Sequence, residues 1–420
     1  MRRGVAAAFV AALALVAAAP AGASTNAAYG IQDDAWLLYG PGTLPDRLTT
    51  LQNLGVGVVR FTLRWDAVSP TKPSNARNPD DGAYEWGAYG DVLDGLHDHG
   101  MRALVTLYGS PRWANGGGSA NRLPKTGFGN FAFAAAKRFP WVHMWTAWNE
   151  PNSRTFSVPV SPSIYVRTVL NPAYASLHQA SSANKLAGGV TSPRKTPSGM
   201  SPLTYMQGMR AAHARLDAYA QNPYPIERNE TPLSSRCAAC FTMAELGSIR
   251  ANVTRYFGGK PLWLTEYGYQ TNPPDRLLGV SYALQAKYIG EAALRVWKQP
   301  GVTVLIHFLV RDEPSLGGWQ SGLFSASGAP KLAYHAFALP LAQVSRNGSR
   351  VALWGEVRPG SGRRAYVLQR LVGGSWRSVG GTFHTGANGA FSRTVALPAR
   401  TAVRISAPSV GWSSPALTLS

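Results

Sequence analysis

The sequence predicts a protein of the α/β class, in which a closed barrel of eight parallel strands with alternating helices, a (β/α)8 or TIM barrel, precedes a small all-β sandwich. Two apolar runs, 142–148 and 262–264, lack apolar–polar alternation, which is typical of strands buried on both faces. Each run leads to a glutamate, Glu150 and Glu266, and a closed parallel barrel gathers distant strand ends at one face. After Pro340, short β-prone runs spaced by about ten residues indicate the sandwich.

The chain of 420 residues divides into three expected segments: a leader over 1–23, the barrel over 24–340, and an immunoglobulin-like or fibronectin-like sandwich over 341–420. Two arginines open the leader, an apolar core follows, and Ala-Gly-Ala ends it with the small-residue pattern of a signal-peptidase site. The alternative is a membrane anchor, but the apolar core is shorter than the roughly 20 residues that a span needs. We therefore expect a signal peptide and a secreted or cell-wall-associated protein, with no membrane span once the leader is removed.

The chain is strongly basic, with 41 lysines and arginines against 21 acidic residues and a formal net charge of +20. The segment 341–420 holds ten of the arginines and a single acid, Glu356. No nucleic-acid-binding motif accompanies this charge, so no nucleic-acid partner is expected. The basic segment either contacts an anionic cell-wall polymer or is a soluble basic surface. We expect a monomer.

The first strand is expected near Tyr29, and Asp33 follows it. The carboxylates of Asp33 and of the adjacent Asp34 either contact a ligand or cap the helix expected over 44–54. The β-branched run 56–63 predicts the second strand. Arg60 interrupts this run, and because a buried unpaired charge costs several kcal/mol, Arg60 requires an acceptor.

The later elements alternate along the chain. Strands are expected at 101–108, 142–148, 186–190, 216–225, 261–266 and 302–309, and helices at 91–99, 129–139, 164–182, 203–215, 242–256 and 281–296. Pro151 disfavours helical backbone for the residue before it, so Glu150 is expected in an extended conformation. His97 and His99 are expected to be helix-end residues, since no third ligand is spaced to complete a metal site.

The two glutamate motifs carry a family resemblance. Asn-Glu-Pro at 149–151 and Thr-Glu-Tyr-Gly at 265–268 resemble the fourth-strand and seventh-strand signatures of the clan A retaining glycoside hydrolases. Within that clan the surrounding sequence is most similar to families 5 and 39 and to the cellulase-like proteins near them. The resemblance spans about 29–338, and it implies a glycosidase that acts on a carbohydrate.

The resemblance also implies roles for single residues. Glu150 is expected to be the acid/base and Glu266 the nucleophile. Arg60 matches the clan's second-strand arginine, and Tyr224 matches a tyrosine that donates to the nucleophile; together they would keep Glu266 ionised. The alternative for Tyr224 is a loop tyrosine between prolines. Asn149 is expected to bind the sugar 2-hydroxyl.

Further substrate-binding candidates lie on the loops that follow the strands: Asp33, Trp65, Trp113, Asn222 and Trp319. Trp113 lies where the clan presents an aromatic platform, although a loop tryptophan also packs on a barrel. The eighth strand departs from the clan's pattern, which often places a tryptophan there, because this run reads His-Phe-Leu at 307–309. Trp319 is expected to take over that contact.

The chain has two cysteines, Cys237 and Cys240. Because no further cysteine completes a zinc site and an exported context is expected, a local disulfide is favoured over a redox or metal role. The sequence holds no HExxH, Walker or dinucleotide motif, so no metal and no cofactor are expected.

Cleavage of a glycosidic bond needs a proton for the leaving oxygen and stabilisation of a cationic sugar centre, which two carboxyl groups in different environments supply. We expect retaining hydrolysis of β-O-glycosidic bonds in oligo- or polysaccharides such as xylan, glucan or mannan. Two alternatives stay open. One is a transglycosylase with the same site, and the other is a catalytically inactive barrel that binds glycan or the cell wall.

Overall fold

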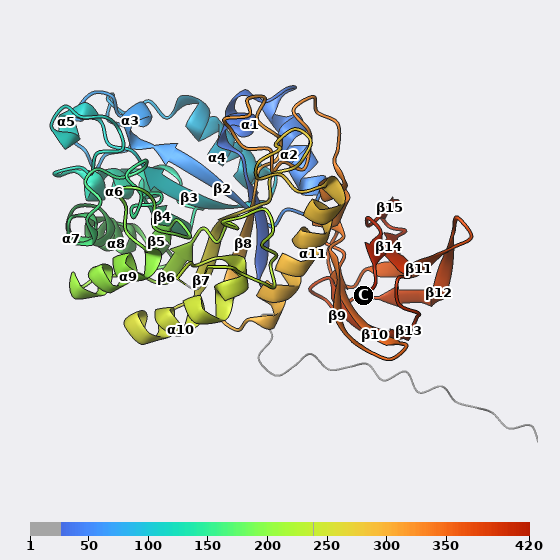
Figure 1. Cartoon of the computed structure of the whole chain (residues 1–420). Coiled ribbons are helices and arrows are strands. Elements are labelled where there is room, and N and C mark those ends of the chain that lie inside the picture. The colour runs from blue at the N-terminus through green and yellow to red at the C-terminus, as the bar shows by residue number, and fades with distance from the viewer. Residues whose placement is uncertain (1–26, 238) are drawn as a thin grey trace, which may run out of the picture.

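The computed structural model describes residues 27–237 and 239–420, and the predicted leader over 1–23 lies outside them. The described chain contains a closed barrel in which β1 to β8 follow one another in order and every neighbouring pair is parallel (Figure 1). This confirms the predicted (β/α)8 barrel. The strands are β1 (Ala28–Gln32), β2 (Val58–Arg64), β3 (Arg102–Tyr108), β4 (Met144–Ala147), β5 (Lys185–Thr191), β6 (Ala218–Gln221), β7 (Leu262–Tyr267) and β8 (Val302–Phe308).

Helices alternate with the strands and surround the barrel. They are α1 (Asp34–Tyr39), α2 (Leu44–Asn53), α3 (Trp65–Val68), α4 (Gly87–Asp98), α5 (Arg112–Asn115), α6 (Phe128–Arg138), α7 (Pro162–Tyr165), η1 (Val166–Leu170), α8 (Asn171–Ala180), α9 (Pro202–Ala211), η2 (Met243–Glu245), α10 (Leu246–Phe257), α11 (Tyr282–Lys298) and α12 (Leu332–Ala338). The helix predicted over 164–182 is interrupted by η1, a π-helical turn. Among the described residues, no helix has the length and apolar character needed to cross a membrane.

Residues two positions apart on a strand point to the same side, so the inward-facing side chains of the barrel form layers. The lower layer is apolar and the upper layer is polar. Val58 and Leu104 belong to the lower layer, a cluster of buried apolar side chains. Two positions further along the same strands stand Arg60 and Thr106, which are also buried. The polar layer therefore lies at the C-terminal ends of the strands and rests on a packed apolar floor.

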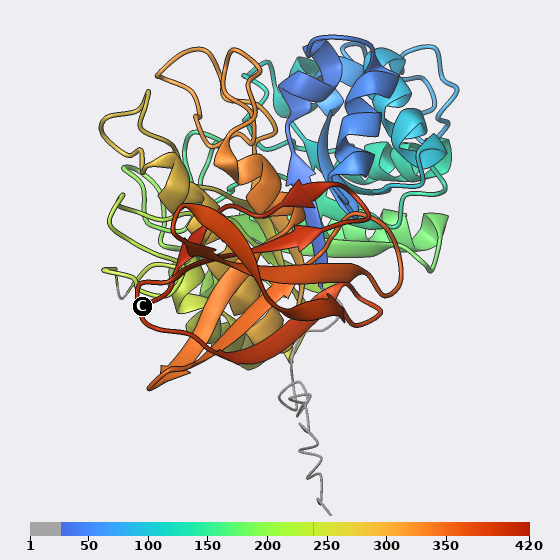
Figure 2. The ribbon, with the colours of Figure 1, turned by 90° about the vertical axis from the view of Figure 1, so that its right-hand side faces the viewer.

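After α12 the chain forms two antiparallel sheets, which we call the module (Figure 2). One sheet has the order β13–β10–β9; the other has the order β12–β11–β14–β15, and β16 also pairs with β14. This arrangement confirms the predicted sandwich. The strands are β9 (Leu341–Asn347), β10 (Arg350–Glu356), β11 (Ala365–Val372), β12 (Ser375–His384), β13 (Ala390–Ala396), β14 (Ala402–Ala407), β15 (Trp412–Ser413) and β16 (Leu417–Thr418).

The module packs against α11 and against the N-terminal end of β1 (Figure 1). The rings of Trp297 on α11 and Trp354 on β10 have their centroids 5.9 Å apart. The Arg358 guanidinium lies 4.1 Å from the centroid of the Tyr29 ring and 3.1 Å from a carboxylate oxygen of Glu356. The module is therefore held against the barrel by aromatic packing and by the stacking of the Arg358 guanidinium on Tyr29.

Candidate active site

The two predicted glutamates project from the C-terminal ends of two barrel strands. Glu266 lies in β7, and Glu150 follows the end of β4 by three residues. The chain turns sharply at that point, because Trp148 and Glu150 have φ angles of 72° and 39°. The expectation that Glu150 is extended is therefore wrong. Positive φ is costly for bulky residues, and here it is held by hydrogen bonds from the Trp148 N–H to the Leu107 carbonyl and from the Glu150 N–H to the Val190 carbonyl.

Glu266 is surrounded by donors. Its Oε1 forms an ion pair with the Arg60 guanidinium, and its Oε2 accepts a hydrogen bond of 3.1 Å from the Tyr224 hydroxyl. Arg60 is 1% exposed and also donates to Thr106 Oγ1 (2.9 Å) and Asn149 Oδ1 (3.0 Å). The buried guanidinium is thus fully engaged, as its position inside a strand requires.

Glu150 is held differently. No cation pairs with it directly among the described residues, and its Oε1 accepts a hydrogen bond of 3.1 Å from the Asn222 side-chain amide. Asn222 is oriented in turn by Thr265, whose hydroxyl donates to Asn222 Oδ1 at 2.7 Å. Burial, followed by the negative charge of Glu266, raises the pKa of Glu150 to about 8, while the Asn222 hydrogen bond and the Arg60 charge oppose this rise. At neutral pH Glu150 therefore carries a proton that it can donate.

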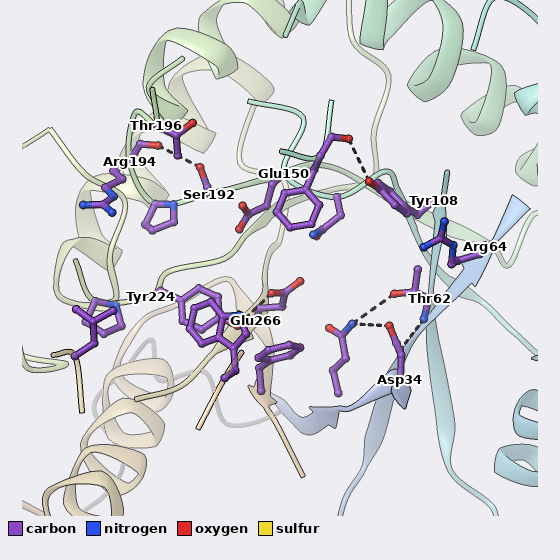
Figure 3. A pocket seen from close by; sticks show the side chains of 18 of the residues that line it. Asp34, Thr62, Arg64, Tyr108, Glu150, Ser192, Arg194, Thr196, Tyr224 and Glu266 are labelled. Atoms are coloured by element: carbon purple, nitrogen blue, oxygen red, sulfur yellow. Dashed lines mark hydrogen bonds between the residues drawn. The ribbon is translucent and has the colours of Figure 1, made fainter. Parts of the chain in front are cut away.

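A cavity of about 540 Å³ opens above the two carboxyl groups (Figure 3). Each of the eight strands, or the loop directly after it, contributes a side chain to its lining: Gln32, Thr62, Tyr108, Glu150, Ser192, Tyr224, Glu266 and Phe308, in strand order. Asn149 and Trp319 also line it, whereas Arg60 and Asn222 reach it through the glutamates that they contact. No residue of the module belongs to the lining.

Three predicted binding residues do not line this cavity. Asp33 is buried, accepts a hydrogen bond of 2.9 Å from the Trp36 N–H as the N-cap of α1, and also accepts one of 3.1 Å from the Arg311 N–H. Trp65 and Trp113 pack against each other with ring centroids 5.3 Å apart, in an aromatic cluster on the outside of β2 and β3. Asp33 therefore caps α1 and not the helix over 44–53, which Thr43 caps, and Trp113 packs on the barrel as its alternative interpretation expects.

Asp34, which lies beside Asp33 and is the other carboxylate expected to contact a ligand or to cap a helix, does line the cavity. The sequence reasoning missed other polar residues of the cavity. Thr62 and Arg64 also line the cavity. A signal for these two was present, because they follow the inward-pointing Arg60 at intervals of two residues on one strand.

Cys237 and Cys240 form a disulfide, with Cα atoms 5.3 Å apart, in the loop between β6 and η2. This loop begins with Tyr224, and Glu230 organises it by accepting hydrogen bonds from the N–H groups of Ile226 and Arg236. Within residues 27–237 and 239–420, no group of three or more histidine, cysteine, aspartate or glutamate side chains is placed to hold a metal ion.

No protein-family model matches the sequence, and no curated protein matches it. Solved structures do share the fold. The chain is similar to a glucosidase from Croceicoccus marinus, with a TM-score of 0.59, 12% identity and coverage of 90% of this chain and 94% of that one. It is also similar to CelM2, a bifunctional glucanase-xylanase protein from a metagenome library (TM-score 0.53, 11% identity, coverage 90% and 95%). A third is GH5_18 from Streptomyces cattleya in complex with GlcNAc (TM-score 0.52, 14% identity, coverage 74% and 79%).

Proposed function

We propose that this protein is a retaining β-glycosidase that hydrolyses β-O-glycosidic bonds by double displacement. The observation that carries the proposal is that two carboxyl groups face one cavity from contrasting environments. Glu150 is desolvated and protonated at neutral pH, whereas Glu266 is paired with Arg60. Glycosidases need this combination of a proton donor and an anionic nucleophile. The fold shared with solved glycosidases and the two glutamate motifs support the same conclusion.

The reaction follows from these environments. In the first step a Glu266 carboxylate oxygen attacks the anomeric carbon while Glu150 protonates the glycosidic oxygen, which leaves as an alcohol. In the second step water attacks the anomeric carbon, Glu150 accepts the water's proton, and Glu266 departs. Asn149 is held by Arg60 at the base of the cavity, where its free amide N–H faces the sugar 2-hydroxyl in our proposal. Retention needs carboxyl groups about 5 to 5.5 Å apart, and Glu266 lies near enough to Glu150 for its charge to raise the pKa of that carboxyl group.

The test is hydrolysis of a panel of aryl β-glycosides together with xylan, glucan and mannan. Wild type is expected to cleave at least one member, and proton NMR is expected to show the β-anomer of the sugar as the first product. Glu266→Gln and Glu150→Gln should each lose this activity on polysaccharides, whereas the matched control Glu291→Gln, on α11 outside the cavity, should retain it. A first product of α configuration would refute retention. If no substrate of the panel were hydrolysed but the protein still bound a polysaccharide, a glycan-binding protein would be favoured instead.

The leader and the basic module bear on where the enzyme acts. We propose export through the predicted leader, a monomeric state, and contact between the arginine-rich module and an anionic wall polymer. N-terminal sequencing of the exported protein should begin after residue 23. Sedimentation with teichoic-acid-containing cell walls should capture the protein at low ionic strength and release it at high ionic strength, because exposed charge interactions are screened by salt. Capture that does not respond to salt would exclude the electrostatic contact.

A further inference from the structure

The cavity is chemically uneven, and one half of it is polar. This polar half consists of Gln32, Asp34, Thr62, Arg64, Tyr89 and Tyr108. Asp34 is fixed in it, because its two carboxylate oxygens accept hydrogen bonds from the Thr62 N–H (3.0 Å) and from the Gln32 amide (3.2 Å). In Figure 3 the labelled members of this half lie together on one side of Glu150. A carboxylate, an amide, hydroxyls and a guanidinium in one place provide partners for the several hydroxyls of a sugar ring, which otherwise lose their hydrogen bonds to water.

The other half is formed by the loops after β5, β6, β7 and β8, and its lining is largely apolar. This apolar half consists of Pro193, Pro225, Ile226, Leu278 and Trp319. The Ser192 hydroxyl beside it is already engaged, because it donates to the Arg194 carbonyl (3.1 Å) and accepts from the Asn152 amide (2.9 Å). Two further polar residues line the cavity beside Ser192: Thr196, whose hydroxyl donates to Ser153 Oγ at 3.5 Å, and Arg194, whose side chain is exposed to solvent. Because the Ser192 and Thr196 hydroxyls are engaged, this half offers a second sugar few hydrogen bonds besides those of Arg194.

The loops that form the apolar half also carry exposed aliphatic side chains. Leu278 is 49% exposed, its neighbour Leu277 is 84% exposed, and Leu316, on the loop of Trp319, is 66% exposed. Exposed apolar surface next to a cavity marks a binding surface. Because these side chains are aliphatic, the surface fits an alkyl chain better than a polar polysaccharide.

We infer that the substrate is a β-glycoside of a long-chain alcohol, a lipid-type glycoside, whose sugar occupies the polar half and whose alkyl chain lies along the apolar half. This inference rests on the proposed function and narrows the expected polysaccharide substrate. The Glu150 proton goes to the exocyclic oxygen, the bond from that oxygen to the anomeric carbon breaks with its electron pair on the oxygen, and a bond from the anomeric carbon to Glu266 forms. The first product released is the aliphatic alcohol, and water then releases the sugar.

The test uses the full-length exported chain and the sugar that is cleaved fastest in the aryl panel. That sugar is supplied as its methyl, butyl, hexyl and octyl β-glycosides, each below its critical micelle concentration. We expect kcat/KM to rise by about two- to fourfold per added methylene, because each methylene leaves water for the apolar half. In Leu278→Ser the octyl-to-methyl ratio of kcat/KM should fall by about fivefold or more, since a serine does not replace the apolar contact.

Leu371→Ser is the matched control, because this leucine on β11 of the module is 41% exposed and lies outside the cavity lining. It should keep the wild-type ratio. Three outcomes would each overturn the lipid-type substrate and leave the proposed function intact. They are equal kcat/KM for the methyl and octyl glycosides, an octyl-to-methyl ratio unchanged in Leu278→Ser, and faster cleavage of a polysaccharide than of the octyl glycoside. No cleavage of any glycoside would overturn the proposed function, and the inference would fall with it.

Discussion

Two buried arginine–glutamate pairs lie at opposite ends of the barrel. In the site pair, Arg60 and Glu266, one glutamate oxygen faces the guanidinium and the other meets only the Tyr224 hydroxyl at the cavity. In the docking pair, Glu356 and Arg358, both side chains are 7% exposed. The Arg358 guanidinium there also donates to the Phe337 carbonyl at 2.8 Å and lies against two aromatic rings.

The comparison shows that a buried ion pair alone does not identify a reactive site. The docking pair borders a different cavity, of about 350 Å³ between the barrel and the module, and Glu356 is the single acidic residue in its lining. The site pair opens onto a cavity that holds a second carboxyl group, Glu150. A second carboxyl group in the same cavity separates the candidate nucleophile from the structural glutamate.

Breaking the site pair should give the largest effect of all. Glu266→Gln removes the attacking oxygen, so kcat is expected to fall by about 10⁴-fold or more. The measurement is steady-state hydrolysis of the best aryl β-glycoside, with circular dichroism as the check on folding. A variant that keeps more than a tenth of wild-type kcat would show that Glu266 is not the nucleophile.

Breaking the docking pair should affect stability instead. Glu356→Ala leaves the Arg358 guanidinium buried without its carboxylate, which is expected to lower the free energy of unfolding by about 3 to 5 kcal/mol. Urea unfolding measures this change, and kcat of the folded protein should stay within twofold of wild type. If Glu356→Ala abolished kcat while the protein remained folded, the two ends of the barrel would be coupled and the contrast would be wrong.

The raised pKa of Glu150 predicts a pH dependence. A carboxyl group whose pKa rises from 4.5 to about 8 on folding contributes stability that is fully present below pH 4.5 and is lost as the pH rises through 8. The free energy of unfolding should therefore decline over this range, by at most about 5 kcal/mol from this group. In Glu150→Gln the decline should be smaller, and kcat/KM of the wild type should fall above pH 8 as the proton donor is lost. A stability profile identical in both proteins would contradict the assignment.

The smallest effect is expected at Tyr224. Tyr224→Phe removes a hydrogen bond to the charged Glu266, which is worth about 1.5 to 3 kcal/mol, so kcat/KM should fall by about 10- to 100-fold. Tyr269→Phe is the control. This buried hydroxyl donates to the Glu230 carbonyl at 2.9 Å, and Tyr269 does not line the cavity. Equal losses in the two variants would indicate a packing effect rather than support of the nucleophile.

The barrel and the centre of the site were predictable from the sequence, and the reason is physical. Arg60 stands within a β-branched run and had to find an acceptor, so its presence pointed to a buried anion at the strand ends. Glu150 and Glu266 end apolar runs, and the topology of a parallel barrel places such ends together. Both arguments use the local pattern of apolar and β-branched residues, which can be read directly from the sequence.

Loop positions could not be predicted in this way. Asp33 and Asp34 are adjacent and chemically identical, and the backbone of α1 decides that the first caps the helix and the second lines the cavity. Trp65 and Trp113 were assigned to the substrate because they are loop aromatics, but they contact each other, and only the packing of several segments determines this.

The inward-facing side of β2 suggests how this protein could be re-engineered. Val58 packs in the barrel floor, Arg60 contacts the candidate nucleophile Glu266, and Thr62 and Arg64 line the cavity, so one strand contributes to the floor, to the glutamate layer and to the cavity wall in turn. Successive members of this series stand about 6.6 Å apart along the strand. Libraries randomised at the two upper positions should therefore change sugar preference while the catalytic layer beneath them stays intact.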